Sequence, residues 1–325
     1  MKDISIFTFV VLVFLSLSCG QVDPLLTAAK SGQLAISSDP PGATIVLNGV
    51  ATEFVTPDTL NDVSVGHHTV TVELQGYHTC TGSLSVDVLV NQVTLAEVFV
   101  LLDEDIQHIV LGEDFTSTTC DPCYSSSLIL DGLAAELAGS FVVVRYHVWW
   151  PPPGNDPFYL ANIEENKARN DYYKNFLAPH LFLDGADAGQ DHGAWSALIA
   201  ERALLETHID LELAVTPAGT GGTVTASILS CTDYSSRDLH VRFAITEDEV
   251  DYEAPNGKEV FYQVMRDMLP DAAGEPLSLL PNAKREISRE YAIEPEWNPD
   301  KLNIVVFIQD DDTREVLQAA TAALP

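Results

Sequence analysis

The sequence has few basic residues. Its 325 residues include 16 Lys and Arg against 48 Asp and Glu, which gives a formal net charge of -32 at pH 7. A negative excess of this size repels the phosphates of nucleic acids and of anionic lipids. We therefore exclude nucleic acid as a partner, together with any membrane contact that depends on attraction to anionic lipid.

Long apolar runs are missing from most of the chain. After residue 18 no stretch reaches about 18 consecutive apolar residues, so the sequence predicts no transmembrane helix there. The exception is the run from Ile4 to Leu17, which follows Lys2 and has the length of a secretory signal rather than of a membrane span. The hydrophobic content of 46% and charged content of 20% are those of a globular protein, with room for two or three domains.

The end of this run resembles the lipobox of bacterial lipoproteins. Leu15-Ser16-Leu17-Ser18 precedes Cys19, and Gly20 follows it. The resemblance implies a signal peptide of residues 1–18, acylation of Cys19, and a lipidated tether of residues 19–32 that holds the chain on a membrane. Gly20 after the cysteine favours the outer membrane, but it does not indicate whether the protein lies on the periplasmic or the surface face. The alternative is plain secretion with a free Cys19.

Residues 33–103 form the first predicted domain. Apolar and polar residues alternate in several short segments separated by turn-forming residues, which is typical of a small all-β domain. The order of its turns resembles a PEGA domain, which implies a β-sandwich that serves as a spacer or binds envelope components. The landmarks are Pro40-Pro41-Gly42-Ala43, Asn48-Gly49, Thr56-Pro57, Gly66-His67-His68 and Gly76-Tyr77.

Residues 104–208 form the second predicted domain, with a different pattern. We expect a buried strand over residues 106–115, a helix that opens at Cys120-Asp121-Pro122-Cys123, and a second apolar strand over residues 141–148. Leu128, Ile129 and Leu133 lie in the expected apolar stripe of the helix. The Cys-x-x-Cys pair therefore opens the helix of a βαβ unit, a context that indicates redox chemistry.

The position of the pair predicts a role for each cysteine. Free backbone N–H groups and the helix dipole stabilise a thiolate at Cys120, which makes it the nucleophile. Cys123, one turn further along, is placed to attack the mixed disulfide and release the substrate. The alternative is a permanently oxidised disulfide with a structural role only.

The same domain resembles thioredoxin-like proteins. The resemblance assigns proton exchange with the resolving cysteine to Asp114, with Glu113 as the alternate if the strand register differs by one. It also implies that Pro179, after Ala178, is the cis-proline that faces the disulfide. Residues 186–193 look too polar and rich in glycine to form a strong strand.

The sequence predicts no metal site and no cofactor. Zinc normally takes four ligands, and the chain has no second Cys-x-x-Cys and no His-x-x-x-His. A copper carrier would combine the cysteine pair with His147, His180 or His192, but its usual Cys-x-x-x-Cys spacing is absent. Asp310-Asp311-Asp312 has no glycine-containing loop of calcium-ligand spacing, so we expect a solvated turn there.

Residues 209–325 return to a strand pattern. Their apolar segments give about seven strands, the number expected of an immunoglobulin-like β-sandwich. From about residue 107 onward the chain resembles the outer-membrane-protein-28-like lipoproteins, which implies a thioredoxin-like domain followed by a β-domain. The residues that carry this resemblance are Glu113-Asp114-Phe115-Thr116, Tyr146-His147, Tyr172-Tyr173, Pro179 with Asp184-Gly185, residues 264–270 and residues 305–309.

Together these patterns predict a multidomain α/β plus all-β lipoprotein of the bacterial cell envelope. Its expected function is thiol–disulfide exchange with thiols or disulfides of exported proteins. The alternative is a non-catalytic surface lipoprotein for adhesion or envelope assembly, so enzyme activity stays open. Exposure of Cys120 favours the first function, and burial of both sulfurs favours the second. Cys80 and Cys231 fall in different β-domains, and the sequence leaves them unpaired.

Overall fold

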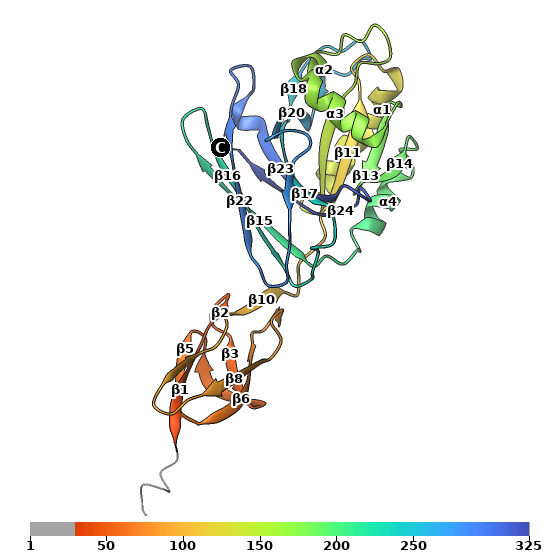
Figure 1. Ribbon diagram of the computed structural model, residues 1–325. Helices are drawn as coiled ribbons and strands as arrows, with labels where there is room; N and C mark the ends of the chain where they lie inside the picture. Colours follow the sequence, from red (N-terminus) through yellow and green to blue (C-terminus); the bar gives the residue numbers. More distant parts are fainter. Residues whose placement is uncertain (1–29, 325) are drawn as a thin grey trace, which may run out of the picture.

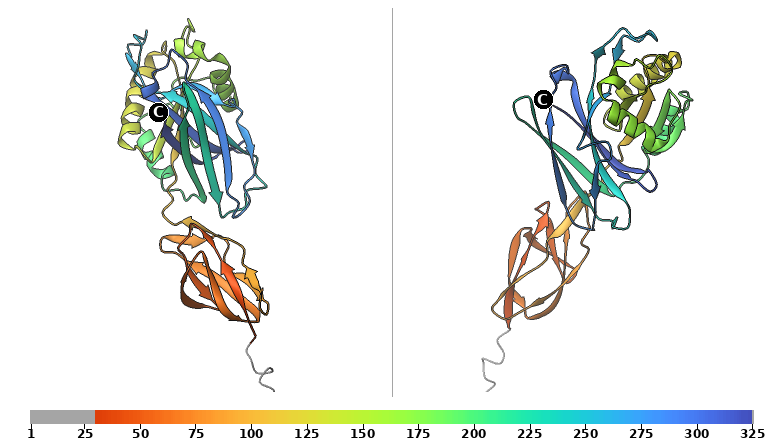
Figure 2. Two further views of the ribbon diagram at one scale, coloured as in Figure 1. Left: turned by 90° about the vertical axis from the view of Figure 1, so that its left-hand side faces the viewer. Right: turned by 45° about the horizontal axis from the view of Figure 1, so that its top comes forward.

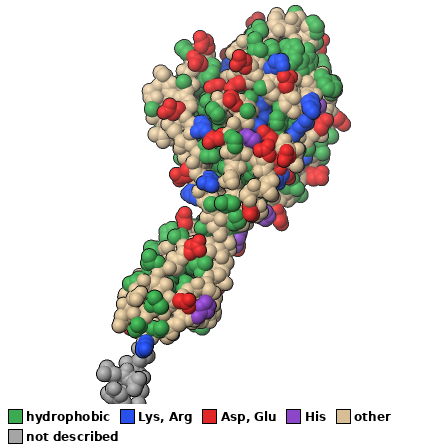
Figure 3. All heavy atoms as spheres, in the orientation of Figure 1, with side chains coloured by type: hydrophobic (Ala, Val, Ile, Leu, Met, Phe, Trp, Pro, Cys, Tyr) green, Lys and Arg blue, Asp and Glu red, His purple; other side chains and the backbone are tan. Residues whose placement is uncertain are grey.

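The structure, a computed structural model, describes residues 30–324 and consists mainly of β-strands. A small N-terminal domain is joined end-on to a larger body, and the chain enters the small domain at its far end (Figure 1). Asp and Glu side chains are scattered over the visible face of the body (Figure 3). Among the described residues no helix is long and apolar enough to cross a membrane. The expected signal peptide and Cys19 lie outside the described residues.

The N-terminal domain encloses its own hydrophobic core between short sheets. Its buried side chains include Leu34, Ile45, Leu60 and Val70, from alternating positions of four strands. One sheet has the order β4 (Val50–Val55), β3 (Thr44–Leu47), β6 (Gly66–Glu73), β8 (Leu84–Val88), and the second β5 (Asp58–Ser64), β1 (Ser31–Ile36), β9 (Val93–Leu95). A third joins β2 (Ser38–Asp39), β10 (Phe99–Asp103) and β7 (Tyr77–Thr79).

The body is organised around a nine-stranded sheet that runs through most of the remaining chain. The order along this sheet is β14-β13-β11-β12-β20-β17-β23-β24, with β21 paired to β17. Its strands are β11 (Val110–Thr116), β12 (Phe141–His147), β13 (His180–Leu183), β14 (Ala186–Gly189), β17 (Leu239–Glu247), β20 (Val264–Leu269), β21 (Glu275–Leu277), β23 (Leu302–Asp310) and β24 (Val316–Ala323).

One half of this sheet contains the βαβ unit that the sequence predicts. β11 and β12 are parallel and joined by helix α1 (Asp121–Glu136), while β13 runs antiparallel to β11. Helices α1 and α4 (Trp195–Arg202) pack with one face of these strands, and Trp195 is completely buried there. Helices α2 (Pro157–Ala161) and α3 (Ile163–Tyr173) follow β12, and Tyr173 of α3 belongs to a second core cluster that includes Phe115 and Tyr146.

The other half of the sheet forms a sandwich with a second sheet. Strand β16 (Gly221–Ser230) lies between β15 (Ile209–Pro217) and β22 (Arg285–Ala292), and their apolar side chains share a core with β17 and β23. Figure 2 shows these two layers beside the helical part of the body. A short hairpin of β18 (Val250–Asp251) and β19 (Val260–Phe261), and a 3-10 turn (Pro299–Lys301), complete the elements. The described residues after 208 form ten strands, β15 to β24, where the sequence predicts about seven.

Strands on both sides of the expected boundary at residue 208 belong to the same sheet. Arg145 of β12 pairs with Val264 of β20, and one core cluster contains Phe115 as well as Phe307. The two expected domains therefore share a sheet and a core, instead of packing as two separate units. The sequence did not reveal this, because the pairing joins strands more than 100 residues apart.

Two local expectations in this region were wrong. Residues 186–189 form strand β14, because their backbone pairs with β13 even though three of the four are Ala or Gly and the fourth is Asp. Leu128 and Ile129 are 50% and 37% exposed, so they are not part of the buried stripe of α1. The buried side of that helix instead carries Cys123, Ser126, Ser127, Leu130 and Leu133.

Candidate functional site

Cys120 and Cys123 form a disulfide at the N-terminus of α1. Cys120 is the N-cap residue, Cys123 lies in the first turn, and their Cα atoms are 5.3 Å apart. No side chain caps this end of the helix, and Pro122 occupies a first-turn position where its missing N–H has no helical acceptor to lose. The positive end of the helix dipole therefore lies at the disulfide, the arrangement that stabilises a thiolate after reduction.

Pro179 lies beside this disulfide. The Ala178–Pro179 peptide bond is cis, and the carbonyl oxygen of Ala178 is 3.4 Å from Cys120 Sγ. Strand β13, which begins at the next residue, pairs with β11 and so fixes the loop next to the start of α1. The structure thus brings Pro179 together with the cysteine pair, while its role in a reaction stays a prediction.

Both cysteines are buried, which the sequence did not predict. Each exposes only 1% of its surface. The loop between β18 and β19 belongs to the C-terminal half of the chain and contacts the segment before α1. Asn256 Nδ2 donates to the carbonyl oxygens of Ser117 and Cys120 at 3.2 and 3.1 Å, and its backbone N–H donates to Thr118 O at 3.1 Å.

Asp114, the expected proton acceptor, is buried beneath the same helix. Arg145 Nε is 3.9 Å from Asp114 Oδ2, and Arg145 Nη2 forms an ion pair with Asp131 of α1 at 2.6 Å. Burial raises the pKa of Asp114 to about 6, and the positive charge of Arg145 opposes this rise. Asp114 Oδ1 has no hydrogen-bond partner among the described residues. Its carboxylate is therefore free to take up a proton near neutral pH.

Glu113, the alternate proton acceptor, is hydrogen-bonded to Arg169 and Tyr173. Arg169 donates to Glu113 Oε1 from Nε at 3.0 Å and from Nη2 at 2.5 Å, and the Tyr173 hydroxyl donates to Oε2. All three side chains are buried. Adjacent residues on a strand point to opposite faces, so only one of Glu113 and Asp114 can lie under α1. The structure places Asp114 there.

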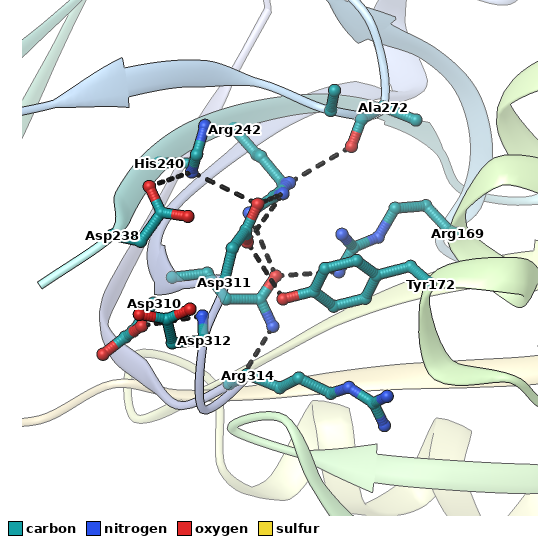
Figure 4. A network of polar contacts seen from close by, with 12 residues as sticks. Arg169, Tyr172, Asp238, His240, Arg242, Ala272, Asp310, Asp311, Asp312 and Arg314 are labelled. Carbon is teal, nitrogen blue, oxygen red and sulfur yellow. Dashed lines mark hydrogen bonds and ion pairs between the residues drawn. The ribbon is translucent and has the colours of Figure 1, made fainter.

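Arg169 also donates to Gln309 Oε1 at 3.1 Å, which extends the Glu113 network into the C-terminal half of the chain. Figure 4 shows the polar contacts around Arg169, Tyr172 and Arg242 there. Arg242 donates from Nη2 to both carboxylate oxygens of Asp311 at 2.9 Å, and the Tyr172 hydroxyl donates to Asp311 Oδ1 at 2.9 Å. Asp310 is only 2% exposed and forms an ion pair with Arg237. The expected solvated turn at residues 310–312 is therefore partly wrong, because the buried Arg242 and the partly exposed Arg237 pair with two of its carboxylates.

A buried histidine and aspartate hold the loop before Cys120. Asp156 Oδ2 contacts His147 Nδ1 at 2.8 Å and accepts the backbone N–H of Thr118 at 2.6 Å. Asp156 Oδ1 accepts the N–H of Phe158 at 2.9 Å as the N-cap of α2. Although burial opposes ionisation, the His147 contact and these N–H donors lower the pKa of Asp156 to about 2. Sequence reasoning missed Asp156, whose only local signal is its place before Pro157.

Two of the histidines considered as copper ligands, His147 and His180, contact other side chains instead. His147 Nδ1 is engaged by Asp156, and His180 contacts Asn175 and Asp187 at 2.7 and 2.8 Å. Within residues 30–324, the one group of three His, Cys, Asp or Glu side chains close enough to share a metal ion is His78, Cys80 and Cys231.

Two of those residues form a second disulfide. Cys80 and Cys231 are bonded, with their Cα atoms 4.9 Å apart, and His78 Nε2 lies 3.3 Å from Cys231 Sγ. Cys80 follows β7 of the N-terminal domain and Cys231 follows β16 of the body. The two cysteines that the sequence left unpaired therefore link the small domain covalently to the body.

Comparison with known proteins adds two family matches. Residues 31–97 match the PEGA domain, and residues 166–325 match the family described as outer membrane protein Omp28. No curated protein matches the sequence significantly.

One solved structure supports the fold, and a second is reported for its family. HBP35 of Porphyromonas gingivalis is 13% identical with a TM-score of 0.59, over 68% of this chain and 76% of that one. A domain of the outer membrane lipoprotein Omp28 from Porphyromonas gingivalis is 17% identical over 37% of this chain and 90% of that one, with a TM-score of 0.26. The family matches confirm the expected resemblance and the outer-membrane location: the chain carries a PEGA domain at residues 31–97 and a region of the outer membrane protein Omp28 family at residues 166–325.

Proposed function

We propose that this lipoprotein carries out thiol–disulfide exchange on exported proteins at Cys120 and Cys123, within a thioredoxin-like unit. The observation that carries the proposal is the position of Asp114. The disulfide lies at the N-terminus of α1, and Arg145 and Asp131 connect the same helix to the buried carboxyl of Asp114, whose pKa is raised to about 6. A buried carboxylate oxygen without a hydrogen-bond partner costs stability, and a purely structural disulfide does not explain that cost. Exchange, by contrast, requires a group that accepts a proton.

The proposed reaction uses each of these groups once. In the reduced protein the Cys120 thiolate attacks one sulfur of a substrate disulfide, forms a mixed disulfide, and releases the other substrate sulfur as a thiolate. Asp114 takes the proton of the Cys123 thiol, and the Cys123 thiolate attacks Cys120 Sγ. The bond between Cys120 and the substrate breaks, and the second substrate sulfur leaves. The substrate gains two electrons, and the cysteine pair is oxidised. The reverse sequence oxidises a substrate dithiol.

The experiment that tests this function is substrate trapping in the cell envelope. Cys123→Ala leaves Cys120 able to attack but removes the resolving thiol, so we expect mixed disulfides to accumulate and to disappear on treatment with a thiol reductant. Cys120→Ala is the matched control and should trap nothing. If the Cys123→Ala protein yields no thiol-sensitive adducts, thiol–disulfide exchange is not its function.

The burial of both sulfurs favours a second candidate function. With each cysteine 1% exposed and Asn256 bonded across the loop, the disulfide in this state cannot contact another protein. A non-catalytic lipoprotein for adhesion or envelope assembly would need nothing more from this disulfide than stability. Under this alternative, either cysteine variant loses stability, by a few kcal/mol or less for so short a loop, and neither forms adducts.

Anchoring of the protein is part of the same proposal. Acylation of Cys19 would hold the chain on the outer membrane, with the PEGA domain as a spacer, or as a contact to envelope components, between membrane and body. We expect the mature protein to partition into detergent and Cys19→Ala to move it to the aqueous phase. Unchanged partitioning of Cys19→Ala would rule out the lipid at that residue.

A further inference from the structure

We propose that Lys258, from the C-terminal half of the chain, is a positioning residue of the Cys120–Cys123 site, and that it acts on Asp114 through Asp131 and Arg145. The inference deepens the proposed function, since it concerns the group that accepts the proton of Cys123. It assigns part of the site to a hairpin that the sequence places in a different domain.

Lys258 is held in an unusual environment for a lysine. Its side chain is only 3% exposed, and its Nζ is 2.6 Å from Asp131 Oδ2. Lysine is almost never buried to this degree without a paired charge. The turn that carries it is fixed at several points: Ala254 N–H donates to Lys258 O at 2.9 Å, and Lys258 N–H donates to Asn256 Oδ1 at 3.1 Å. Asn256 in turn bonds to Cys120 O, so the hairpin is tied to the disulfide loop.

The charges between Lys258 and Asp114 alternate in sign. Lys258 pairs with Asp131, Asp131 pairs with Arg145 at 2.6 Å, and Arg145 Nε lies 3.9 Å from Asp114. Each step joins a different element: the β18–β19 hairpin, helix α1, strand β12 and strand β11. Without Lys258, the negative charge of Asp131 would be compensated by Arg145 alone. The net positive potential that stabilises an ionised Asp114 would then be smaller.

The groups that face Asp114 define the expected direction of the effect. Arg145 and His147 from β12 and Lys258 from the hairpin each lower the pKa of Asp114, whereas Asp131 from α1 raises it. Loss of Lys258 removes one of the lowering charges and leaves Asp131 less compensated. The pKa of Asp114 should then rise above about 6. At neutral pH a larger fraction of Asp114 would be protonated and unable to accept the proton of Cys123.

The test compares Lys258→Met, Lys258→Arg and Lys167→Met in the full-length protein. Lys167 is a matched control, because it also pairs with an aspartate, Asp171, but both side chains are at least half exposed. The decisive readout is the titration of the Asp114 carboxyl carbon by NMR. A second readout is the pH dependence of the rate at which the reduced protein resolves a mixed disulfide with glutathione.

We expect Lys258→Met to move the Asp114 titration upward by about one pH unit, and to move the midpoint of the resolution rate with it. Lys258→Arg should restore the parent midpoint, and Lys167→Met should not shift it. An Asp114 titration that is the same in Lys258→Met and the parent overturns the inference. If Lys258→Met does not fold, Lys258→Gln removes the charge and keeps a donor for Asp131, and the same outcomes apply.

The two proposals fail in different ways. If the titration shifts as expected but Cys123→Ala traps no substrate, Lys258 positions Asp114 and exchange is not the function. If trapping succeeds but the titration does not move, exchange stands and the role assigned to Lys258 is wrong.

Discussion

Asn256 Nδ2 lies 3.1 Å from the carbonyl oxygen of Cys120, although 136 residues separate them in the chain. The same side-chain amide also bonds to Ser117 O, so one residue fixes both ends of the loop that leads into α1. Both cysteines of the disulfide are buried beside this contact. We expect movement of the β18–β19 loop to be one step in exposing Cys120 to a reductant or a partner protein.

Asn256→Ala should therefore speed reduction of the Cys120–Cys123 disulfide. Loss of two hydrogen bonds of about 1 kcal/mol each favours local opening by roughly tenfold or more, and the rate of reduction by a phosphine should rise in proportion. Asn61→Ala, in the N-terminal domain, serves as the control. Equal reduction rates for the parent protein and Asn256→Ala would show that the loop does not limit access.

The buried carboxyl of Asp114 should destabilise the fold at neutral pH. Its folded-state pKa of about 6 lies above its ordinary value of 3.8, so the folded state binds the proton more tightly than the unfolded state does. Stability from this group is fully present below about pH 4 and is lost as the pH rises through about 6. Asp114→Asn should raise the free energy of unfolding at pH 7 by at most about 3 kcal/mol, and change it little at pH 4.

Urea unfolding of Asp114→Asn at the two pH values measures this effect. Asp105→Asn, at an exposed position before β11, should leave the stability unchanged at both. A stabilisation at pH 4 as large as that at pH 7 would mean that Asp114 is not protonated in the folded protein at pH 4. The burial account of its pKa would then be wrong.

Residues 104–208 should not fold alone. Strand β12 would lose its pairing with β20, and the core around Phe115 would lose Phe307 and its neighbours. We expect this fragment to lack a cooperative thermal transition, whereas residues 104–325 with Cys231→Ser should unfold cooperatively. Circular dichroism of the two fragments provides the measurement. A cooperative transition in the shorter fragment would support the independent domain that the sequence predicts.

The Cys80–Cys231 disulfide should hold the small domain on the body after the chain between them is cut. With a protease site introduced at Asp105, the cleaved protein should run as one band on a denaturing gel without reductant and as two bands with it. Two bands without reductant would show that the cysteines are not paired. A Cys231→Ser protein cleaved at the same place supplies the reference pattern.

Patterns in the sequence predict the parts of this protein that are determined by neighbouring residues, such as turns, helix starts and buried strands. The turn at Asn48-Gly49, the position of Cys120 at the start of a helix and the apolar strands on either side of it follow from backbone preference and hydrophobic spacing. The same reasoning brings Cys120 and Cys123 together, whereas Asp114 and Pro179 join the candidate site through the resemblance to thioredoxin-like proteins.

The sequence does not predict the contacts made across long separations. Lys258 and Asn256 look like loop residues, and nothing near them in sequence indicates a cysteine site 136 residues before Asn256. Leu128 fits a helical stripe by spacing, but the helix instead turns Cys123 and Ser127 toward the core. The hairpin from the other half of the chain bonds to the loop that carries Cys120. Exposure of Cys120, which distinguishes the two functions, is therefore settled by tertiary packing alone.

The reduction potential of the Cys120–Cys123 disulfide tests the proposed exchange most directly. It is measured by equilibrating the full chain, carrying Cys80→Ser and Cys231→Ser, with a series of dithiol redox buffers and trapping the free thiols. If the pair performs exchange, the potential should fall between about -270 and -120 mV, the range of known thiol–disulfide oxidoreductases. A potential below about -300 mV, typical of structural disulfides, would contradict the account and leave the non-catalytic lipoprotein as its function.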